Sequence, residues 1–402
     1  MRFPHGMADT SRARLLSRAL LGAGADVRVI CLQASERPPL IENVERRGTW
    51  MGVPFEYTAP STVRHDSFLA RRLLAACGWA QGALRLAQLR RGGCLDVVYL
   101  WMWAPRPGVH RYALLGFLKA LGIPVVMELN EYPWPLREDV SSLGRRLSPL
   151  AGVSGVVSIS AMLSRWAGEA ARGRRLEIVQ VPIVVDTDEV VPAPYPDGDP
   201  VLVFAGSPVY DDTIRFLVAT MRHVWEAVPA CRLVITGANP GDPAALWLHQ
   251  ELEPGLDSRV EVAGYLPRAE LLALYTKAHA LLIPLFDDAR SRARFPTKIA
   301  EYLAAARPVV TTAVGEVSEY LEDGRDAIVC PPGDPLLYAQ NILRVLADSG
   351  LAADVGRNGR ALAERLFDYR LYGPALRDAF AAVAGRGEPA PTEPSRERSA
   401  TA

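Results

Sequence analysis

Residues 295–310 read FPTKIAEYLAAARPVV, two charges set into an otherwise apolar run that looks like a short helix. Pro296 fits the entry of a helix, where its missing N–H costs little. The amides of residues 297–299 would then point outward and, with the helix dipole, favour an anion. Lys298 adds a full positive charge there, and Glu301 follows on the same face. A phosphate at the helix tip and a sugar diol on Glu301 together have the shape of a nucleotide. The alternative is an ordinary surface pair, worth roughly a few tenths of a kcal/mol.

The chain on both sides of this stretch alternates short apolar strands with amphipathic helices. In the first half we expect strands at 26–32, 96–101, 124–129, 155–159 and 177–181. Helices are expected between them at 11–24, 68–91 and 109–121. After the Pro- and Gly-rich residues 192–200 the alternation restarts with a strand at 201–205. This rhythm predicts an α/β fold of parallel sheets with right-handed crossovers.

The break at residues 192–200 divides the chain into two similar α/β units. We predict an N-terminal domain at 1–191, a linker at 192–200 and a C-terminal domain at 201–370. A helix at 371–385 is expected to pack back on the first domain, and residues 386–402 to form a disordered tail. Ligands of such sheets bind at the carboxyl ends of the strands, so two facing units would enclose one cleft.

Composition excludes several classes of protein. Lys plus Arg and Asp plus Glu number 45 each, so no basic excess indicates a nucleic-acid partner. The five cysteines are scattered without CxxC spacing, which favours reduced thiols in a cytosolic protein over disulfides or a metal site. No apolar run approaches the roughly 18–20 residues of a membrane span, and no signal peptide opens the chain. We therefore expect a cytoplasmic protein.

Two short motifs imitate known sites. GAGAD, at residues 22–26, follows a helix and precedes a strand, the reverse of the order that a dinucleotide fingerprint requires. We interpret it as a helix end and turn. DTD, at residues 186–188, imitates the paired carboxylates of metal-dependent sugar transferases, but a turn before the linker is favoured. No metal site is predicted.

Residues 278–334, AHALLIPLFDDARSRARFPTKIAEYLAAARPVVTTAVGEVSEYLEDGRDAIVCPPGD, resemble the donor-binding region of retaining glycosyltransferases of family 4. LVFAGS at 202–207, VPIVVDTDEVVP at 181–192 and GVVSISAMLSRW at 155–166 resemble further parts of that family in the same order. The resemblance implies the GT-B fold, two Rossmann-like domains facing across a cleft, with residues 1–191 as the acceptor-binding domain and residues 201–370 as the nucleotide-sugar-binding domain. It also implies sugar transfer from a nucleoside-diphosphate sugar to a hydroxyl of a glycan, lipid-linked or natural-product acceptor, with retention and without metal or other cofactor.

The resemblance assigns site residues by position. Glu301 is similar to the second Glu of the family's E-x7-E motif, which binds the donor ribose. The full donor set comprises Gly206, Ser207, Gly237, Gly264, Tyr265, Leu266, Arg294, Pro296, Thr297, Lys298 and Glu301. Lys298, Asn130 and Glu131 are the candidate catalytic residues. Glu131 would orient the acceptor hydroxyl or accept its proton, although a structural loop pair explains the two strand-end residues as well. Gly6 and Met7 match the Gly loop on the acceptor side.

The sequence departs from the family pattern at three places. Ala293 stands where many members carry the first Glu of E-x7-E, the residue that approaches the donor sugar. The loop GSPVYDDTIRF, at residues 206–216, lacks the usual Arg and Lys clamp on the diphosphate. Lys298 must then meet that charge, with Arg290, Arg292 or Arg294. Asn130 and Glu131 replace a frequent His-Asp pair.

Three alternatives stay open at this stage. The first strand of the N-terminal domain has little room before Gly6, so it is absent or begins upstream. An epimerase on the same fold and a non-catalytic nucleotide-sugar binder remain rivals to a transferase. The basic, amphipathic helix at 69–91 suits peripheral contact with the inner face of an anionic membrane and equally suits an ordinary protein surface.

Overall fold

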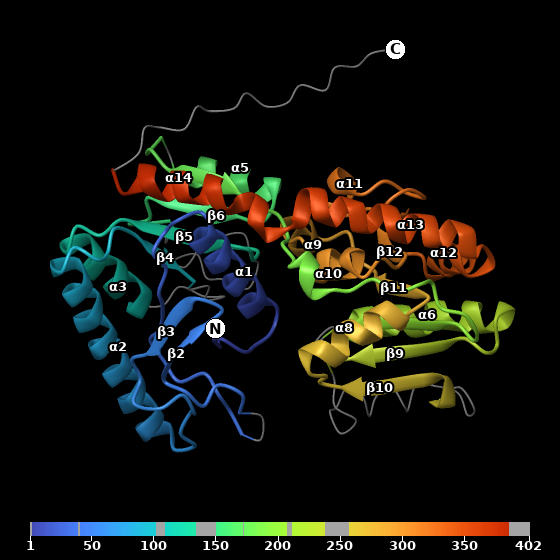
Figure 1. The fold of residues 1–402 in the computed structure, drawn as a ribbon, viewed down its shortest axis with the longest axis horizontal. Helices are drawn as coiled ribbons and strands as arrows, with labels where there is room; N and C mark the ends of the chain where they lie inside the picture. The colour runs from blue at the N-terminus through green and yellow to red at the C-terminus, as the bar shows by residue number, and fades with distance from the viewer. Residues whose placement is uncertain are drawn as a thin grey trace, which may run out of the picture.

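The structure, a computed structural model, describes residues 2–38, 41–101, 109–133, 150–171, 173–206, 211–237 and 257–385. Its helices and strands build the predicted α/β architecture, with two groups of sheets placed side by side (Figure 1). Ser207 and the predicted tail at 386–402 lie outside the described ranges. The linker at 192–200 has no helix or strand.

The first sheet has three strands in the order β1-β3-β2. β1 (Val29–Cys31) runs parallel to β3 (Val53–Tyr57), and β2 (Arg47–Trp50) runs antiparallel to β3. The β2–β3 hairpin was not predicted, and it makes the expectation of purely parallel sheets wrong at this edge. A small apolar cluster around Phe3, Phe55 and Tyr57 packs on it.

The second sheet is parallel throughout, in the order β4-β5-β6-β7. Its strands are β4 (Val98–Leu100), β5 (Val125–Leu129), β6 (Gly155–Ser158) and β7 (Glu177–Gln180). Three helices accompany the N-terminal sheets: α2 (Phe68–Arg91), α3 (Val109–Ala120) and α5 (Ala161–Ala170). The Ser160 hydroxyl caps α5 by accepting from the Leu163 amide.

Among the described residues, no strand bonds to both β1 and β4, and each has a single ladder neighbour. Both strands nevertheless lead into one apolar cluster. Val27, just before β1, and Val97, just before β4, pack against the cluster that α1 (Ala8–Gly22) shares with the second sheet. Side-chain packing, rather than a hydrogen-bonded ladder, therefore joins the two N-terminal sheets.

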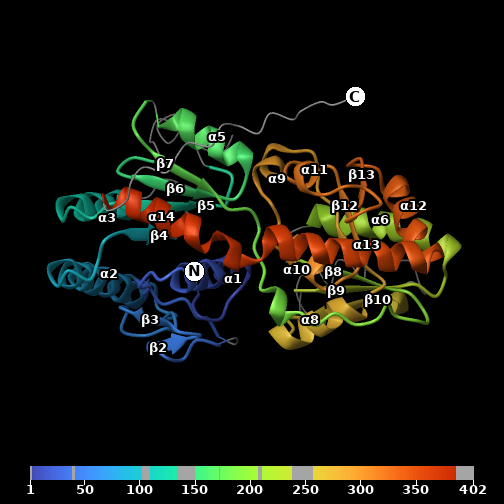
Figure 2. The same ribbon diagram turned by 45° about the horizontal axis from the view of Figure 1, so that its top comes forward.

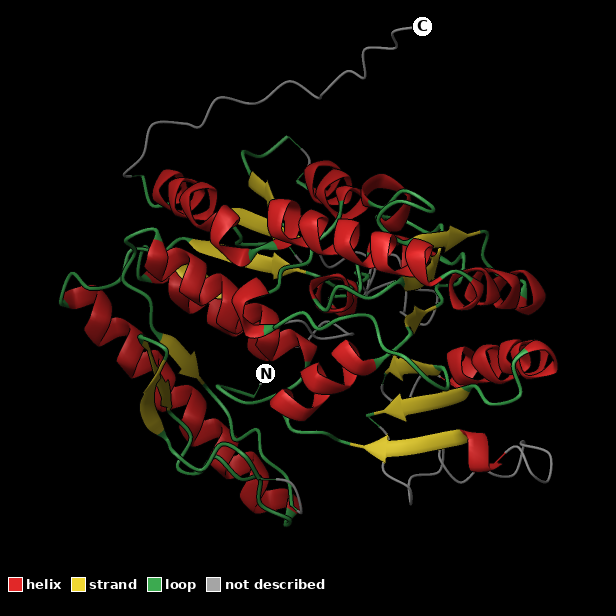
Figure 3. Ribbon diagram, turned by 45° about the vertical axis from the view of Figure 1, so that its right-hand side comes forward, coloured by secondary structure: helices red, strands yellow, loops and turns green. Residues whose placement is uncertain are grey.

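The C-terminal sheet has six parallel strands in the order β10-β9-β8-β11-β12-β13. They are β8 (Val201–Ala205), β9 (Arg232–Thr236), β10 (Val260–Gly264), β11 (Ala280–Ile283), β12 (Val309–Thr312) and β13 (Ile328–Cys330). Figure 3 shows the arrows of β9 and β10 pointing toward the N-terminal half. The carboxyl ends of these strands, where ligands of parallel sheets bind, thus face the other domain.

Helices cover both faces of the C-terminal sheet. α6 (Asp211–Ala227) and α12 (Pro335–Ala347) pack together over one face. α8 (Arg268–Lys277) and α10 (Lys298–Ala304) contribute to the core on the other, and α13 (Ser349–Leu362) supplies buried residues to both. The shorter elements are α9 (Ala289–Ala293), α11 (Val317–Tyr320), the 3-10 turns η2 (Thr187–Glu189), η3 (Asp257–Arg259) and η5 (Tyr369–Tyr372), and the π-helical η4 (Ala363–Phe367).

The chain crosses between the domains twice, and charged side chains join the two crossings. Asp186 accepts from Arg18 of α1 at 2.5 Å and from Arg370 at 2.8 Å, while Arg370 also binds Asp188. α14 (Gly373–Val383) then lies against α1 and the second sheet (Figure 2). Asp186 also caps η2, so the DTD motif is a turn held by arginines. No group of three metal-ligating side chains occurs in the described part of the chain.

A buried ion pair anchors α1 to β5. The Arg12 guanidinium donates to Glu128 at 2.7 Å and to the carbonyls of Val181 and Pro182, and the Tyr99 hydroxyl donates to the same carboxylate. Arg12 is 1% exposed and Glu128 is 3% exposed. Charges this far from water are tolerated only when each is fully paired.

Replacing Glu128 by Gln should therefore leave the buried Arg12 charge without its ionic partner. We expect the free energy of unfolding to fall by about 3 kcal/mol, measured by urea denaturation of the transition that involves the N-terminal sheets. The control is Glu261→Gln, which removes an exposed carboxylate 4.0 Å from Arg232 and should change stability by less than about 0.5 kcal/mol. Equal effects of the two substitutions would contradict the assigned role of the buried pair.

Candidate functional site

The helix that carries Lys298 and Glu301 is fixed beside the end of β8. The Tyr302 hydroxyl accepts a hydrogen bond from the Ala205 amide at 2.8 Å, and the Tyr302 ring packs edge-on against Tyr275 of α8. Residues 299–304 are all buried. The apolar part of the stretch is therefore core, and its two charges lie at the helix start, toward the carboxyl ends of the strands.

One part of the predicted anion site is wrong. The Ile299 amide is not free, because it donates to the Pro296 carbonyl at 3.0 Å. Thr297 already has helical backbone angles and makes no side-chain cap. α10 also has only seven residues, so its dipole is short. Any attraction for an anion here rests more on the Lys298 ammonium than on a row of three amides.

Glu301 is paired with an arginine that the sequence did not reveal. Arg268, at the start of α8, donates to Glu301 Oε1 at 2.5 Å and grips Glu189 with two further bonds of 3.0 and 3.2 Å. We refer to Glu189, Arg268, Lys298 and Glu301 as the charged cluster. No local sequence pattern predicts the contact between Glu189 and Arg268, because the two residues are 79 positions apart.

The titration of the charged cluster reflects its partial burial. Burial opposes the charge on Arg268, but Glu301 and Glu189 more than offset it, so its pKa is raised. Burial lowers the pKa of Lys298, with Glu301 opposing that shift and Arg268 adding to it. A negative charge bound at Lys298 would oppose the lowering of its pKa.

Three predicted glycines line the ends of neighbouring strands. Gly206, Gly237 and Gly264 follow or end β8, β9 and β10, and their backbones are joined. The Gly206 amide donates to Thr236 and the Gly237 amide to Gly264, at 3.2 and 2.7 Å. Gly264 has φ +70°, which favours glycine. The following residues, Tyr265 and Leu266, are exposed and half-buried, leading directly to Arg268.

A second constellation joins the domains. Glu131, just beyond β5, accepts two bonds from the Arg294 guanidinium, the Nε bond measuring 2.7 Å. The structure thus brings together two residues to which the sequence gave separate roles. Asn130 is half-buried beside them. Of the other candidate cations, Arg292 pairs with Asp287 at 2.6 Å, and Arg290 is exposed.

The expected first Glu of E-x7-E is replaced by a packing contact. Ala293 is fully buried, and its carbonyl accepts from Ser160 at 2.7 Å across the domain interface. Glu316 seals the same interface by accepting from the Ala161 amide and the Gln180 side chain, at 2.9 and 3.2 Å. Burial raises the pKa of Glu316. This interface was not predicted.

The Gly loop before α1 needs its glycine. A Cβ on Gly6 would lie 2.3 Å from Thr10 Oγ1, a clash within the first turn of the helix. Met7 occupies the N-cap position of α1 and is 52% exposed. Its exposure leaves the loop accessible to a ligand.

Comparisons with known proteins agree with this geometry. The chain resembles the sucrose-phosphate synthase from Thermosynechococcus elongatus over 94% of both chains, with TM-score 0.68 and 17% identity. It resembles Anabaena Alr3699/HepE, solved with UDP and glucose, over 82% of this chain and 87% of that one, with TM-score 0.60 and 16% identity. The fold is GT-B, with two Rossmann-like domains.

The sequence comparisons specify the class. Residues 199–348 match the family model described as "Glycosyl transferases group 1". A D-inositol 3-phosphate glycosyltransferase from Xylanimonas cellulosilytica is 26% identical over 92% of this chain and 90% of its own length. The protein is a glycosyltransferase similar to those of group 1, as the resemblance in its sequence implied, and an epimerase is not favoured.

A double-mutant cycle on the contact between Glu131 and Arg294 distinguishes two roles for Glu131, as proton acceptor or as a residue that only holds Arg294. If Glu131 accepts the acceptor proton, Glu131→Gln should lower the transfer rate by about 10²–10⁴-fold, even in an Arg294→Met background. If it only holds Arg294, the double variant should be no slower than Arg294→Met alone. Turnover is measured at saturating donor. Near-wild-type turnover of Glu131→Gln would reject the proton-acceptor role.

Proposed function

We propose that the chain transfers a sugar from a nucleoside-diphosphate sugar to an acceptor hydroxyl. The observation that carries this proposal is the charged cluster beside the glycine-lined ends of β8, β9 and β10. Such strand ends are where parallel sheets bind nucleotides. The neighbour HepE was solved with UDP and glucose, which supports a donor of this class.

Each charge has a distinct part in donor binding. Glu301 Oε1 is occupied by Arg268, while Oε2 receives no hydrogen bond from a described residue and is available to a ribose diol. Lys298 binds the diphosphate and stabilises the charge that grows on the leaving group. Arg268 is a positioning residue, because it fixes the Glu301 carboxylate through its second grip on Glu189.

We place the chain in family 4 and propose retention of anomeric configuration. Lys298 and Arg294 would neutralise the diphosphate, so no divalent metal is needed. The fully buried Ala293 leaves the donor sugar without the usual carboxylate at that position. Sugar recognition would then rest on the loops after β5 and β8 and on the interdomain residues, including Glu131.

The acceptor is a hydroxyl compound bound on the N-terminal domain, whether a glycan, a lipid-linked sugar or a natural product. Peripheral contact with an anionic membrane is favoured by Phe68, Leu69, Leu73 and Leu84, which are exposed on the arginine-rich α2. The prediction of an amphipathic helix is wrong, because α2 does not separate its apolar and charged residues onto opposite faces. Sedimentation with anionic vesicles at low ionic strength measures this contact, and no binding would reject it. No described helix is long and apolar enough to cross a bilayer. A cytoplasmic location is supported by the five unpaired cysteines.

Substitution of the two donor-binding charges tests the core of the proposal. Lys298→Met and Glu301→Gln should each weaken binding of UDP, GDP or ADP, whichever binds the wild type, by about tenfold to a hundredfold. Isothermal titration measures the affinity. Lys277→Met, which removes an exposed lysine at the far end of α8, is the matched control. Unaltered affinity and turnover in both test variants would overturn the donor-site assignment.

A chelator experiment tests the metal-free mechanism. With EDTA present, the transfer rate should stay unchanged, because the side chains of the protein supply the positive charge. Proton NMR of the product in the same reaction should show the donor's anomeric configuration. Loss of activity that Mg²⁺ or Mn²⁺ restores would exclude the metal-free proposal, and an inverted product would exclude retention.

A further inference from the structure

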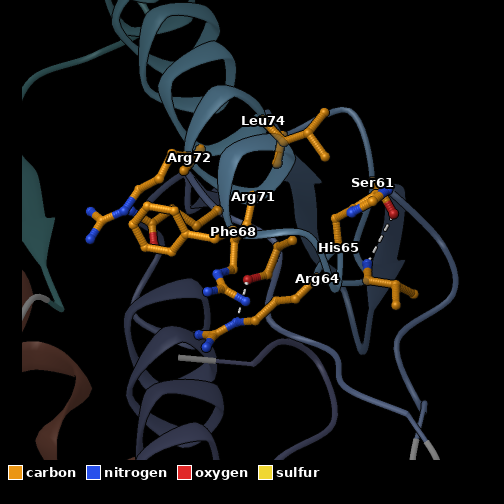
Figure 4. Close-up of a pocket in the computed structure, with 12 residues that line it drawn as sticks. Ser61, Arg64, His65, Phe68, Arg71, Arg72 and Leu74 are labelled. Carbon is orange, nitrogen blue, oxygen red and sulfur yellow. Dashed lines mark hydrogen bonds between the residues drawn. The ribbon is translucent and has the colours of Figure 1, made fainter.

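A cavity of about 230 Å³ lies on the N-terminal domain, away from the charged cluster. It opens at the carboxyl ends of β1 and β3, between the loops that follow those strands and the first turns of α2 (Figure 4). This is the edge of the sheet where ligands of parallel strands bind. Its volume is below the roughly 300–1,000 Å³ of a whole ligand pocket, so it suits one group of a larger molecule.

The lining of the cavity is cationic. Arg64, His65, Arg71 and Arg72 line it, with Ser61 and Gln33 as neutral polar groups. The lining contains no Asp or Glu. In the described part of the chain, none of the three arginines forms a salt bridge, although most of the described arginines elsewhere do. The excess positive charge therefore belongs to the cavity itself.

Arg64 is held in place by a hydrogen bond, whereas Arg71 is exposed. Arg64 is half-buried and donates from Nε to the Ala34 carbonyl at 3.1 Å. Figure 4 shows the Arg71 side chain extending from α2 toward the same place. Burial lowers the pKa of Arg64, and the charges of Arg37 and Arg71 lower it further. The fold thus keeps like charges together, at an energetic cost that a bound anion would remove.

An exposed aromatic ring organises the remaining charge. Phe68, the first residue of α2, is 57% exposed and has the guanidinium groups of Arg71 and Arg72 within 5.7 and 5.2 Å of its ring centre. Cation–π contacts restrain guanidinium groups while leaving their N–H donors free. Planar donors of this kind match the oxygens of a phosphate.

We propose that this cavity binds a phosphate group of the acceptor, with Arg64 and Arg71 as its principal ligands. The identification of the bound molecule as the acceptor rests on the proposed function, in which the donor binds the other domain. The N-terminal domain also carries Glu131 beyond β5, in the other of its two sheets, so the cavity and the candidate residue on the acceptor side belong to one domain. A phosphorylated polyol and a lipid phosphate headgroup share this chemistry.

The test uses inorganic phosphate and the full chain. Titration followed by ³¹P NMR, at constant ionic strength, should show binding to the wild type that the Arg64→Met/Arg71→Met variant weakens about tenfold or more. Arg91→Met, at the other end of α2, removes the same charge from an exposed site and should leave binding unchanged. Equal loss in the control, or no difference between wild type and the double variant, would overturn the proposal.

Three further measurements distinguish a soluble phosphorylated acceptor from a lipid phosphate, and the phosphate site from the proposed transferase function. With a phosphorylated acceptor the double variant should raise KM at least tenfold and leave kcat near wild type, whereas the dephosphorylated acceptor should show no change. A lipid phosphate headgroup is tested with vesicles of phosphatidylcholine and phosphatidic acid in place of the soluble acceptor. UDP affinity should stay constant. The wild type could bind phosphate, and the double variant lose that binding, while neither protein transfers sugar. That result would reject the proposed function and support the anion site.

Discussion

The carboxylate of Asp186 is the point on which the arrangement of the two domains depends. It lies where the chain leaves the N-terminal sheets, and it accepts from Arg18 of α1 and from Arg370, where the chain returns. Thr187 adds a bond to Asp368 on the returning segment at 2.5 Å. Both crossings are thereby tied to each other and to α1. This charged network acts together with an apolar cluster that contains buried residues of both domains.

Once the crossings are fixed, the remaining interdomain contacts follow from position. Glu189, three residues after Asp186 and just before the linker, reaches Arg268 and through it Glu301, so the crossing segment orients the carboxylate proposed to bind the donor ribose. On the far side, Ser160 and Ala161 cap α5 while contacting Ala293 and Glu316. Donor-site geometry in this chain is therefore coupled to domain arrangement through backbone and side-chain contacts rather than set within one domain.

Much of this was accessible from the sequence, for identifiable reasons. Continuous apolar runs such as VLVFA and RLVIT predicted the parallel C-terminal strands, and Pro296 with Lys298 and Glu301 located α10. Local spacing failed where partners are distant in the chain. Arg268 and Glu189 showed no signal, and Ile299 was expected to offer a free amide that the tight helix entry uses. The β2–β3 hairpin escaped because its strands, RGTW and VPFEY, contain Gly, Pro and charged residues that weaken the strand pattern.

The division of the N-terminal strands into two sheets has a mechanical consequence. Ladder hydrogen bonds fix register between neighbouring strands, whereas apolar side-chain packing is non-directional and permits small sliding. The loops after β1 and β3 are attached to one sheet and Glu131 to the other. If the cavity holds the acceptor phosphate as proposed, its distance from Glu131 is set by side-chain packing between the two sheets rather than by a backbone ladder.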